Sequence, residues 1–292
     1  MTSASRQRLY RTEAIILRRQ TFGEADRLLT VYTPGLGKIR VLAKGVRKPT
    51  SRKAGHVELF THATLLVAKG KSLDIVTQAE TINAFSPLRV DLTRAGCGYY
   101  LAELVDRFTE EGEENRRLFE AVLSALLRLS EAEDTDLVLR YFDLRLLDCV
   151  GYRPQLFRCV RCAQAAGEGT VSFIPAEGGV LCAQCLEGER HARRVSPQAL
   201  AVLRHLQVKD FGLCRRLKID RQTHRELEGL LRGYLTYLLE HGLRSADFLD
   251  TLRRQRARSG VQAVTEEPGD IDPPEAVGDQ GQDKEIVTYG ER

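Results

Sequence analysis

The sequence predicts a multidomain α+β protein with a small N-terminal β-barrel, an α-helical domain interrupted by a cysteine-rich insertion, and a disordered acidic tail. Three observations predict this class. Apolar residues alternate with polar ones up to about residue 80 and follow helical spacing after residue 86. Two close pairs of cysteines lie inside the helical region. From Ser259 onward the chain is rich in Pro, Gly, Asp and Glu, and such a composition cannot offset the ordering entropy. The expected domains are 1–83, 84–154, 155–190, 191–258 and 259–292.

Five strands are expected in the first domain. They cover 12–17, 27–32, 38–42, 57–68 and 72–80, with a Pro-Gly-Leu-Gly turn at 34–37 and a hairpin loop at 69–72. Five strands within about seventy residues suit a small barrel, and the OB-fold is the commonest barrel of this kind. An SH3-like barrel or a small sandwich stays possible, because alternation does not order the strands.

The helices of the second domain begin at recognisable caps. Ser-Pro pairs at 86–87 and 196–197 each predict a helix start, because serine caps well and proline suits the first turn. Gly242 is expected to cap the strongest helix, and Ser245 to open a last short helix that ends in a basic stretch at 253–258. The other expected helices cover 88–110, 114–129, 136–150 and 221–241.

Cys159 and Cys162 form one Cys-x-x-Cys pair, Cys182 and Cys185 form another, and nineteen residues separate the pairs. Two such pairs supply the four thiolates of a closed, tetrahedral structural zinc site, so we expect a zinc-ribbon-like insertion with about one Zn2+ per chain. A disulfide framework would need an oxidising compartment, and a redox Cys-x-x-Cys would need only one pair. The other cysteines, at 97, 149 and 214, lie in apolar helical stretches and are expected to be small buried residues.

The sequence contains no catalytic constellation that we can defend, so we expect no enzyme. His56 and Glu58 match the His-x-Glu half of a zinc deaminase motif, but Arg158 precedes Cys159 where that motif has proline. Gly70-Lys71-Ser72 resembles the end of a phosphate loop, but position 65 is leucine and the segment joins two strands.

Charge is segregated along the chain. Residues 1–85 contain fifteen Lys and Arg against six Asp and Glu, whereas residues 259–292 contain two against nine. The loop 44–53 is the densest basic segment, and it favours nucleic-acid binding over an ordinary solvated turn. Phe22 and Tyr32 are candidate stacking residues, although both suit the core better. The candidate nucleic-acid ligands are Lys38, Arg40, Lys44, Arg47, Lys48, Arg52 and Lys53.

The chain has no apolar run long enough to cross a bilayer, and its basic N-terminus lacks the apolar region of a signal peptide. Together with reduced cysteines, this favours a cytoplasmic protein associated with the nucleoid and without a membrane partner.

The ordered set of motifs resembles the RecO family of bacterial recombination mediators. It comprises the segment 18–29, Thr33-x-x-x-Gly37-Lys38, Lys44-Gly45-Val46-Arg47-Lys48, Tyr152-x-Pro154, and Phe173 with Gly178-Gly179, the last two standing before the cysteine pairs. The resemblance implies an N-terminal OB-fold, a helical domain and a zinc-binding insertion. It also implies binding of single- and double-stranded DNA, annealing of complementary strands, a complex with RecR, contact with the C-terminal tail of SSB, and loading of RecA. The alternative hypothesis is a zinc-ribbon scaffold that binds proteins, with incidental affinity for nucleic acid.

Overall fold

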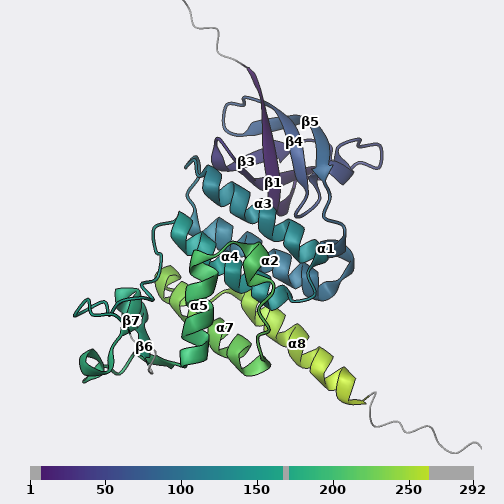
Figure 1. Ribbon diagram of the computed structural model, residues 1–292. Helices are drawn as coiled ribbons and strands as arrows, with labels where there is room; N and C mark the ends of the chain where they lie inside the picture. Colours follow the sequence, from purple (N-terminus) through teal and green to yellow (C-terminus); the bar gives the residue numbers. More distant parts are fainter. Residues whose placement is uncertain (1–7, 167–170, 263–292) are drawn as a thin grey trace, which may run out of the picture. The chain divides into compact units, whose positions relative to one another are not determined.

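The computed structural model describes residues 8–166 and 171–262 (Figure 1). The chain divides into two compact units, residues 1–253 and residues 254–292, and the architecture described below is that of the first unit.

The N-terminal strands form a closed barrel in the order β1-β2-β3-β5-β4, with β4 paired back to β1. All neighbours are antiparallel except β3 and β5, which pair in parallel. Val31, Val41 and Leu65 are among the fully buried residues of the interior. Closure confirms the predicted small barrel and excludes an open sandwich. The strands are β1 (Leu9–Phe22), β2 (Asp26–Thr33), β3 (Gly37–Ala43), β4 (His62–Ala68) and β5 (Asp74–Asn83).

The fourth strand begins later than predicted, at His62 and not at residue 57. Ala54–Val57 is a 3-10 helix (η1), Phe60 has a positive φ of 64°, and the strand starts only at His62. Phe60 is buried in the core cluster that contains the helices. Its ring and the ring of Tyr99 make a T-shaped contact, with their centres 5.3 Å apart. The apolar run before His62 therefore serves contact between the barrel and the helices, and alternation alone could not distinguish this from a strand.

The helices surround one large buried cluster. Helices α2 and α3 contact β1 and β2 of the barrel, and α4 packs against α3, α5 and α7 (Figure 1). Inside the cluster the Tyr100 hydroxyl donates to Asp143 Oδ1 at 3.0 Å, and Asp143 also pairs with the buried Arg140. The helices are α1 (Pro87–Val90), α2 (Leu92–Phe108), α3 (Arg116–Glu131), α4 (Thr135–Cys149), α5 (Pro197–Val208), α6 (Phe211–Cys214), α7 (Arg221–Leu239) and α8 (Arg244–Gln262).

Two of the predicted helix boundaries are wrong for reasons of capping. The expected helix 88–110 is broken at Asp91, whose side chain accepts from Arg94 N and starts α2. Glu240, in the left-handed region with a φ of 58°, ends α7, so Gly242 is not its cap.

Helix α8 is also longer than the short helix that we expected. It begins at Arg244 and has 19 residues, and its last four lie in the segment assigned to the tail. The rest of that predicted tail, residues 263–292, lies outside the described residues.

The cysteine-rich insertion folds as a small sheet of order β7-β6-β8 between α4 and α5. The ring of Phe173 meets Tyr234 of α7 edge-on at 5.3 Å, and Arg204 of α5 donates to the carbonyl of Leu156 at 2.9 Å. These contacts attach the insertion to the helices that follow it. Its elements are β6 (Val171–Ile174), η2 (Pro175–Glu177), β7 (Gly179–Leu181), η3 (Ala183–Leu186) and β8 (Arg193–Val195).

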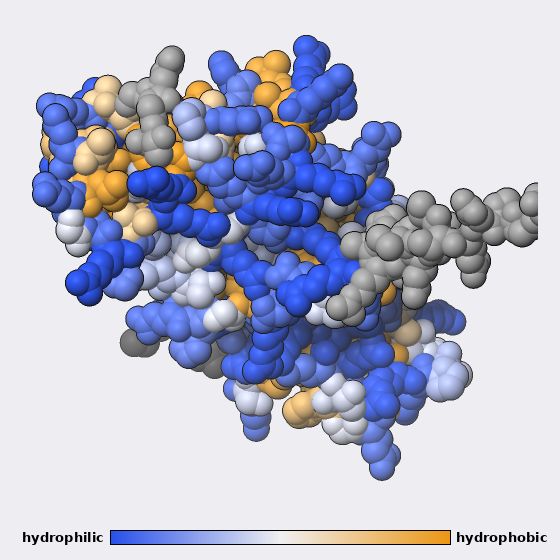
Figure 2. Space-filling model, turned by 90° about the horizontal axis from the view of Figure 1, so that it is seen from below, coloured by the Kyte–Doolittle hydropathy of each residue, from blue (hydrophilic) through white to orange (hydrophobic). Residues whose placement is uncertain are grey.

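On the face seen in Figure 2, hydrophilic residues predominate and hydrophobic residues occur in small separate patches. Among the helices of the described ranges, none has the length and apolar character required to cross a membrane.

Candidate metal centre and nucleic-acid interface

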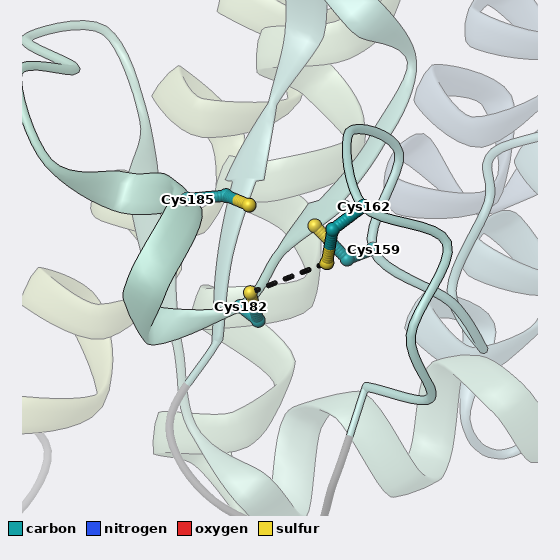
Figure 3. Close-up of side chains that lie close together, drawn as sticks. All are labelled: Cys159, Cys162, Cys182 and Cys185. Atoms are coloured by element: carbon teal, nitrogen blue, oxygen red, sulfur yellow. Dashed lines mark hydrogen bonds between the residues drawn. The ribbon is translucent and has the colours of Figure 1, made fainter.

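The structure brings together the four predicted metal ligands. The sulfurs of Cys159, Cys162, Cys182 and Cys185 all lie within 4.8 Å of one another, and Figure 3 shows the two pairs facing each other. Cys162 Sγ and Cys182 Sγ are 3.7 Å apart. A tetrahedron with Zn–S bonds of about 2.3 Å has S–S edges of about 3.8 Å. The Cys162–Cys182 distance matches such an edge, and no sulfur–sulfur distance exceeds it by more than about 1 Å, so the cluster can take a four-coordinate zinc ion.

Each pair sits on a tight turn that directs both of its sulfurs to the same side. Ala163 N donates to the carbonyl of Cys159 at 3.0 Å, with Ala163 itself at a positive φ of 59°. In the second pair, Cys185 N donates to the carbonyl of Cys182 at 3.1 Å, at the start of η3. The Cys-x-x-Cys spacing therefore produces the arrangement of each pair locally.

Two contacts hold the pairs in register. The guanidinium of Arg161 binds Glu177, with Nη2–Oε1 at 2.6 Å, and also Glu189, so it joins the first turn to the second. Gly179 allows β7 to approach the first turn, because a Cβ there would lie 2.4 Å from Val160 Cγ1 and 2.8 Å from the carbonyl oxygen of Gln155. Neither contact involves the cysteine side chains.

Thiols this close compete for ionisation in the absence of a cation. Desolvation raises the pKa of Cys159, but backbone N–H groups, first that of Cys162, outweigh it and lower the pKa to about 6. The hydrogen bond with Cys182 is the main reason that the pKa of Cys185 is raised to about 12. A bound cation would let all four ionise, because a metal deprotonates the thiols that coordinate it. The donor set fits zinc, and these four cysteines would hold it.

The deaminase motif does not assemble. His56 Nδ1 lies 2.9 Å from Thr81 Oγ1 in the barrel, and Glu58 pairs with Arg19 and Arg27. His56 lies in the 3-10 helix η1. In the described ranges, the metal-binding group contains cysteines only. Of the other cysteines, those at 97 and 214 are buried as predicted, and the one at 149 is half-buried.

The basic loop 44–53 connects β3 to η1 and is fixed to the turn between β1 and β2. Gly45 N donates to Asp26 Oδ1 at 2.7 Å, and Arg47 N donates to the carbonyl of Ala25 at 2.9 Å. The Arg47 guanidinium donates to the carbonyl of Glu24 at 3.0 Å. The loop is consequently held by its backbone, which leaves most of its charged groups at the surface.

Four of the seven predicted nucleic-acid ligands lie exposed on this loop: Lys44, Arg47, Lys48 and Arg52. None of them forms an ion pair with another described residue. Their cationic groups are available for phosphate oxygens, which is what binding to a nucleic-acid backbone requires.

The other three predicted ligands are engaged within the protein. Lys53 Nζ donates to the carbonyl of Val76 at 2.9 Å, and burial lowers its pKa. Lys38, with only 11% of its side chain exposed, pairs with Asp106 at 3.1 Å. Arg40 Nε pairs with Glu111 at 2.5 Å. Lys38 and Lys53 therefore lie outside the exposed cationic surface, whereas Arg40 is 52% exposed and its charge is paired with Glu111.

Lys38 and Arg40 belong to a seam between β3 and the helical domain. Gly112 N donates to the carbonyl of Lys38 at 2.9 Å. Gly37 lies so close to the linker before α3 that a Cβ there would be 1.8 Å from the carbonyl oxygen of Glu113. The Thr33-x-x-x-Gly37-Lys38 motif thus has a structural explanation, because its glycine permits the seam and its lysine joins it.

The two candidate stacking residues differ. Tyr32 is fully buried in the cluster that includes the helices, as we expected. Phe22 is 47% exposed at the end of β1, so the expectation that it belongs to the core is wrong. It lies next to the turn that holds the basic loop and remains available to stack on a base.

Two hollows of the surface were not predicted from the sequence. One, of about 260 Å³, lies between α3 and α4 and is lined in part by Arg117, Arg128, Tyr141 and Arg145. The other, of about 920 Å³, lies between β1, α2 and the start of α8. Both are built from elements distant in sequence.

Comparison with known proteins agrees with this architecture. The model of the family described as "Recombination protein O N terminal" matches residues 7–85, and that described as "Recombination protein O C terminal" matches residues 89–247. A DNA repair protein RecO of Roseiflexus sp. is 48% identical over 259 residues, which cover 89% of this chain and 91% of the relative. The RecO proteins of Pelotomaculum thermopropionicum and Dehalococcoides mccartyi strain 195 are 38% and 37% identical, with 88% and 84% of this chain covered and 100% and 96% of theirs.

Proposed function

Because the chain belongs to the RecO family of DNA repair proteins, we propose that it binds DNA and anneals complementary single strands, and that with RecR it helps to load RecA on SSB-coated single-stranded DNA. The observation that carries the proposal is a set of four exposed cations, without an ion pair to any described residue, on a loop that is fixed to the barrel. This activity would place the protein on the nucleoid, in the cytoplasm.

We assign the barrel to the OB-fold, because a five-stranded barrel of order β1-β2-β3-β5-β4 has the Greek-key arrangement of that fold. Its role would be electrostatic and would require no covalent step. Two complementary strands repel each other through their phosphates, and a basic surface that holds both reduces this repulsion and raises their local concentration.

The cysteine insertion would be a zinc-ribbon with a structural role. With four protein ligands, a bound zinc has no open position for water or substrate, and its contribution is to fix the two turns in place. The insertion would then brace α7 through the contact of Phe173 with Tyr234, and α5 through the hydrogen bond from Arg204 to the carbonyl of Leu156.

An annealing assay at two salt concentrations tests the proposed function. At about 50 mM salt, the purified protein is expected to accelerate pairing of complementary oligonucleotides, and at about 200 mM the acceleration should fall by at least about tenfold, because phosphate contacts release counterions. Fluorescence quenching of labelled strands measures the rate. Absence of annealing at both salt concentrations would instead favour a zinc-ribbon scaffold that binds proteins.

We further propose that the hollow between α3 and α4 receives the acidic C-terminal tail of SSB. The Arg128 guanidinium lies 4.4 Å from the ring centre of Phe211 and 5.2 Å from that of Tyr141, and it donates no hydrogen bond to another described residue. Burial lowers its pKa but leaves it a cation at neutral pH. A half-buried arginine with free donors beside aromatic rings can bind a carboxylate and an apolar side chain of one peptide.

Replacing Arg128 with glutamate is expected to weaken binding of a labelled SSB tail peptide by about tenfold or more, because a like charge then faces the carboxylates. Fluorescence anisotropy measures the affinity, and Lys218→Glu, on the exposed linker after α6, is the charge-matched control. If Arg128→Glu binds the peptide as the wild type does, the tail docks elsewhere. Affinity for oligonucleotides should be unchanged in both variants.

A further inference from the structure

The larger hollow, which we call the β1–α8 cleft, has a volume of about 920 Å³. Its lining includes Arg18 of β1, Tyr99 of α2, His241 before α8, and Arg244 and Phe248 of α8. Five residues from three separate parts of the chain thus meet there. Nothing in the basic loop or the cysteine centre depends on this cleft.

The cleft carries an excess of positive charge because its carboxylates are already occupied. Glu103 accepts from Ser245 N at 2.8 Å and so caps α8, and Asp106 pairs with Lys38. Arg18 and Arg244 are exposed, and neither guanidinium has a hydrogen bond or ion pair with another described residue. Two free guanidinium groups therefore remain for an anionic ligand.

Aromatic rings stand beside these cations. Tyr99 is 44% exposed and Phe248 is 40% exposed. The Tyr99 ring is held from one side by its edge contact with Phe60, so it does not depend on the ligand for its position. An exposed aromatic face next to an unpaired arginine is the combination that binds a base and its phosphate.

Exposed residues on β1 connect the cleft to the basic loop. Arg18, Gln20 and Phe22 are all exposed and occupy alternate positions, so they share one face of the strand. β1 pairs with β4 only as far as Ile15, and a bulge lies between Ile16 and Arg18. Beyond the bulge the strand stays paired with β2 on one edge, and its other edge has no strand partner among the described residues. From Arg18 to Phe22 the strand extends about 13 Å at about 3.3 Å per residue. Beyond Phe22 is the turn that holds Arg47.

We propose that the β1–α8 cleft is a second binding site for single-stranded nucleic acid, and that one strand runs from the basic loop along β1 into it. The proposal rests on the proposed function, since it extends the same DNA-binding surface. An acidic peptide could also use the free arginines, but it would not account for the exposed residues that lead from the cleft to the loop. A strand held at both ends would be extended between them, with its bases accessible to a complementary strand.

The first experiment compares oligonucleotide length. In the double variant Arg18→Glu/Arg244→Glu, affinity for an oligothymidine of about 20 nucleotides is expected to fall at least about tenfold, and the salt slope to decrease by about 1.4, for two lost phosphate contacts. An oligothymidine of about 6 nucleotides, which the basic loop alone can hold, should lose less than about threefold. Anisotropy measures both, and Arg216→Glu/Lys218→Glu, two exposed cations after α6, is the matched control.

The second experiment locates the bases directly. Ultraviolet crosslinking of a 20-nucleotide strand that contains 5-iodouracil is expected to give adducts on the peptides with Tyr99 or Phe248, identified by mass spectrometry. Wild-type binding that depends on Arg47 and Lys48, with no adduct in the cleft and no effect of Arg18→Glu/Arg244→Glu, would reject the cleft and leave the proposed function intact. If the wild type bound no oligonucleotide at low salt, the proposed function itself would fail. If Arg18→Glu/Arg244→Glu lost affinity for an acidic peptide but kept its affinity for the oligonucleotide, the cleft would be assigned to a protein ligand and the proposal overturned.

Discussion

Reversing Arg47 and Lys48 together to glutamate is expected to weaken binding of single-stranded DNA by about a hundredfold at low salt. Both side chains are exposed, and the change leaves in place the backbone hydrogen bonds that hold the loop. It removes only the hydrogen bond from the Arg47 guanidinium to the carbonyl of Glu24. Two cations that would contact phosphates become two anions that repel them. The plot of log affinity against log salt should become shallower, with the magnitude of its slope smaller by about 1.4, since each phosphate contact on a single strand contributes about 0.7.

This result requires a control for general charge and for folding. Arg216→Glu/Lys218→Glu changes the net charge by the same amount at exposed positions after α6, and its affinity should stay within about threefold of the wild type. Thermal unfolding verifies that both variants fold. An unchanged affinity and slope in Arg47→Glu/Lys48→Glu would remove the loop from the DNA-binding surface.

Replacing Cys182 with serine is expected to abolish the metal site. A hydroxyl is a poor zinc ligand, so the metal content of the purified protein should fall from about one zinc per chain towards zero. Metal binding to such a site is also folding free energy, on the order of 10 kcal/mol in zinc-finger peptides, and the insertion should consequently lose its resistance to proteolysis. Elemental analysis and limited proteolysis measure the two effects.

Cys149→Ser is the matched control, because Cys149 lies at the end of α4 and is half-buried, outside the cluster. It should keep its zinc. Affinity for single-stranded DNA should remain within about threefold in both variants, since the insertion does not contribute to the basic loop. A Cys182→Ser protein that kept its zinc and its protease resistance would contradict the four-thiolate site.

Local spacing made the four-cysteine cluster predictable. Each Cys-x-x-Cys pair forms its own turn, so the sequence needed only to bring two turns together, and nineteen residues suffice for that. The barrel was predictable in outline for a similar reason, because alternation identifies the buried face of each strand. Alternation does not identify a strand's partner, and the parallel pairing of β3 with β5 emerged only from the structure.

The exposed cations of the proposed DNA-binding surface were predictable only in part. The charge density of the loop identified Lys44 and Arg47, but the same criterion selected Lys38, whose partner Asp106 lies 68 residues away. Arg18 and Arg244 show the opposite case, since neither stands in a dense basic run and only the folded chain places them in one cleft. Pairing between distant residues determines which cations remain free, and composition cannot report it.

The seam formed by Gly37, Lys38 and Arg40 bears on how the protein would handle two ligands at once. Ion pairs and a backbone hydrogen bond join the barrel to the helical domain there, so the two parts should move together as one block. A DNA strand bound to the barrel and a peptide bound to α3 would then keep a constant separation during the proposed annealing. In the proposed function, transfer of DNA away from SSB would then depend on motion of the DNA and of SSB, because this protein would hold both ligands at fixed positions.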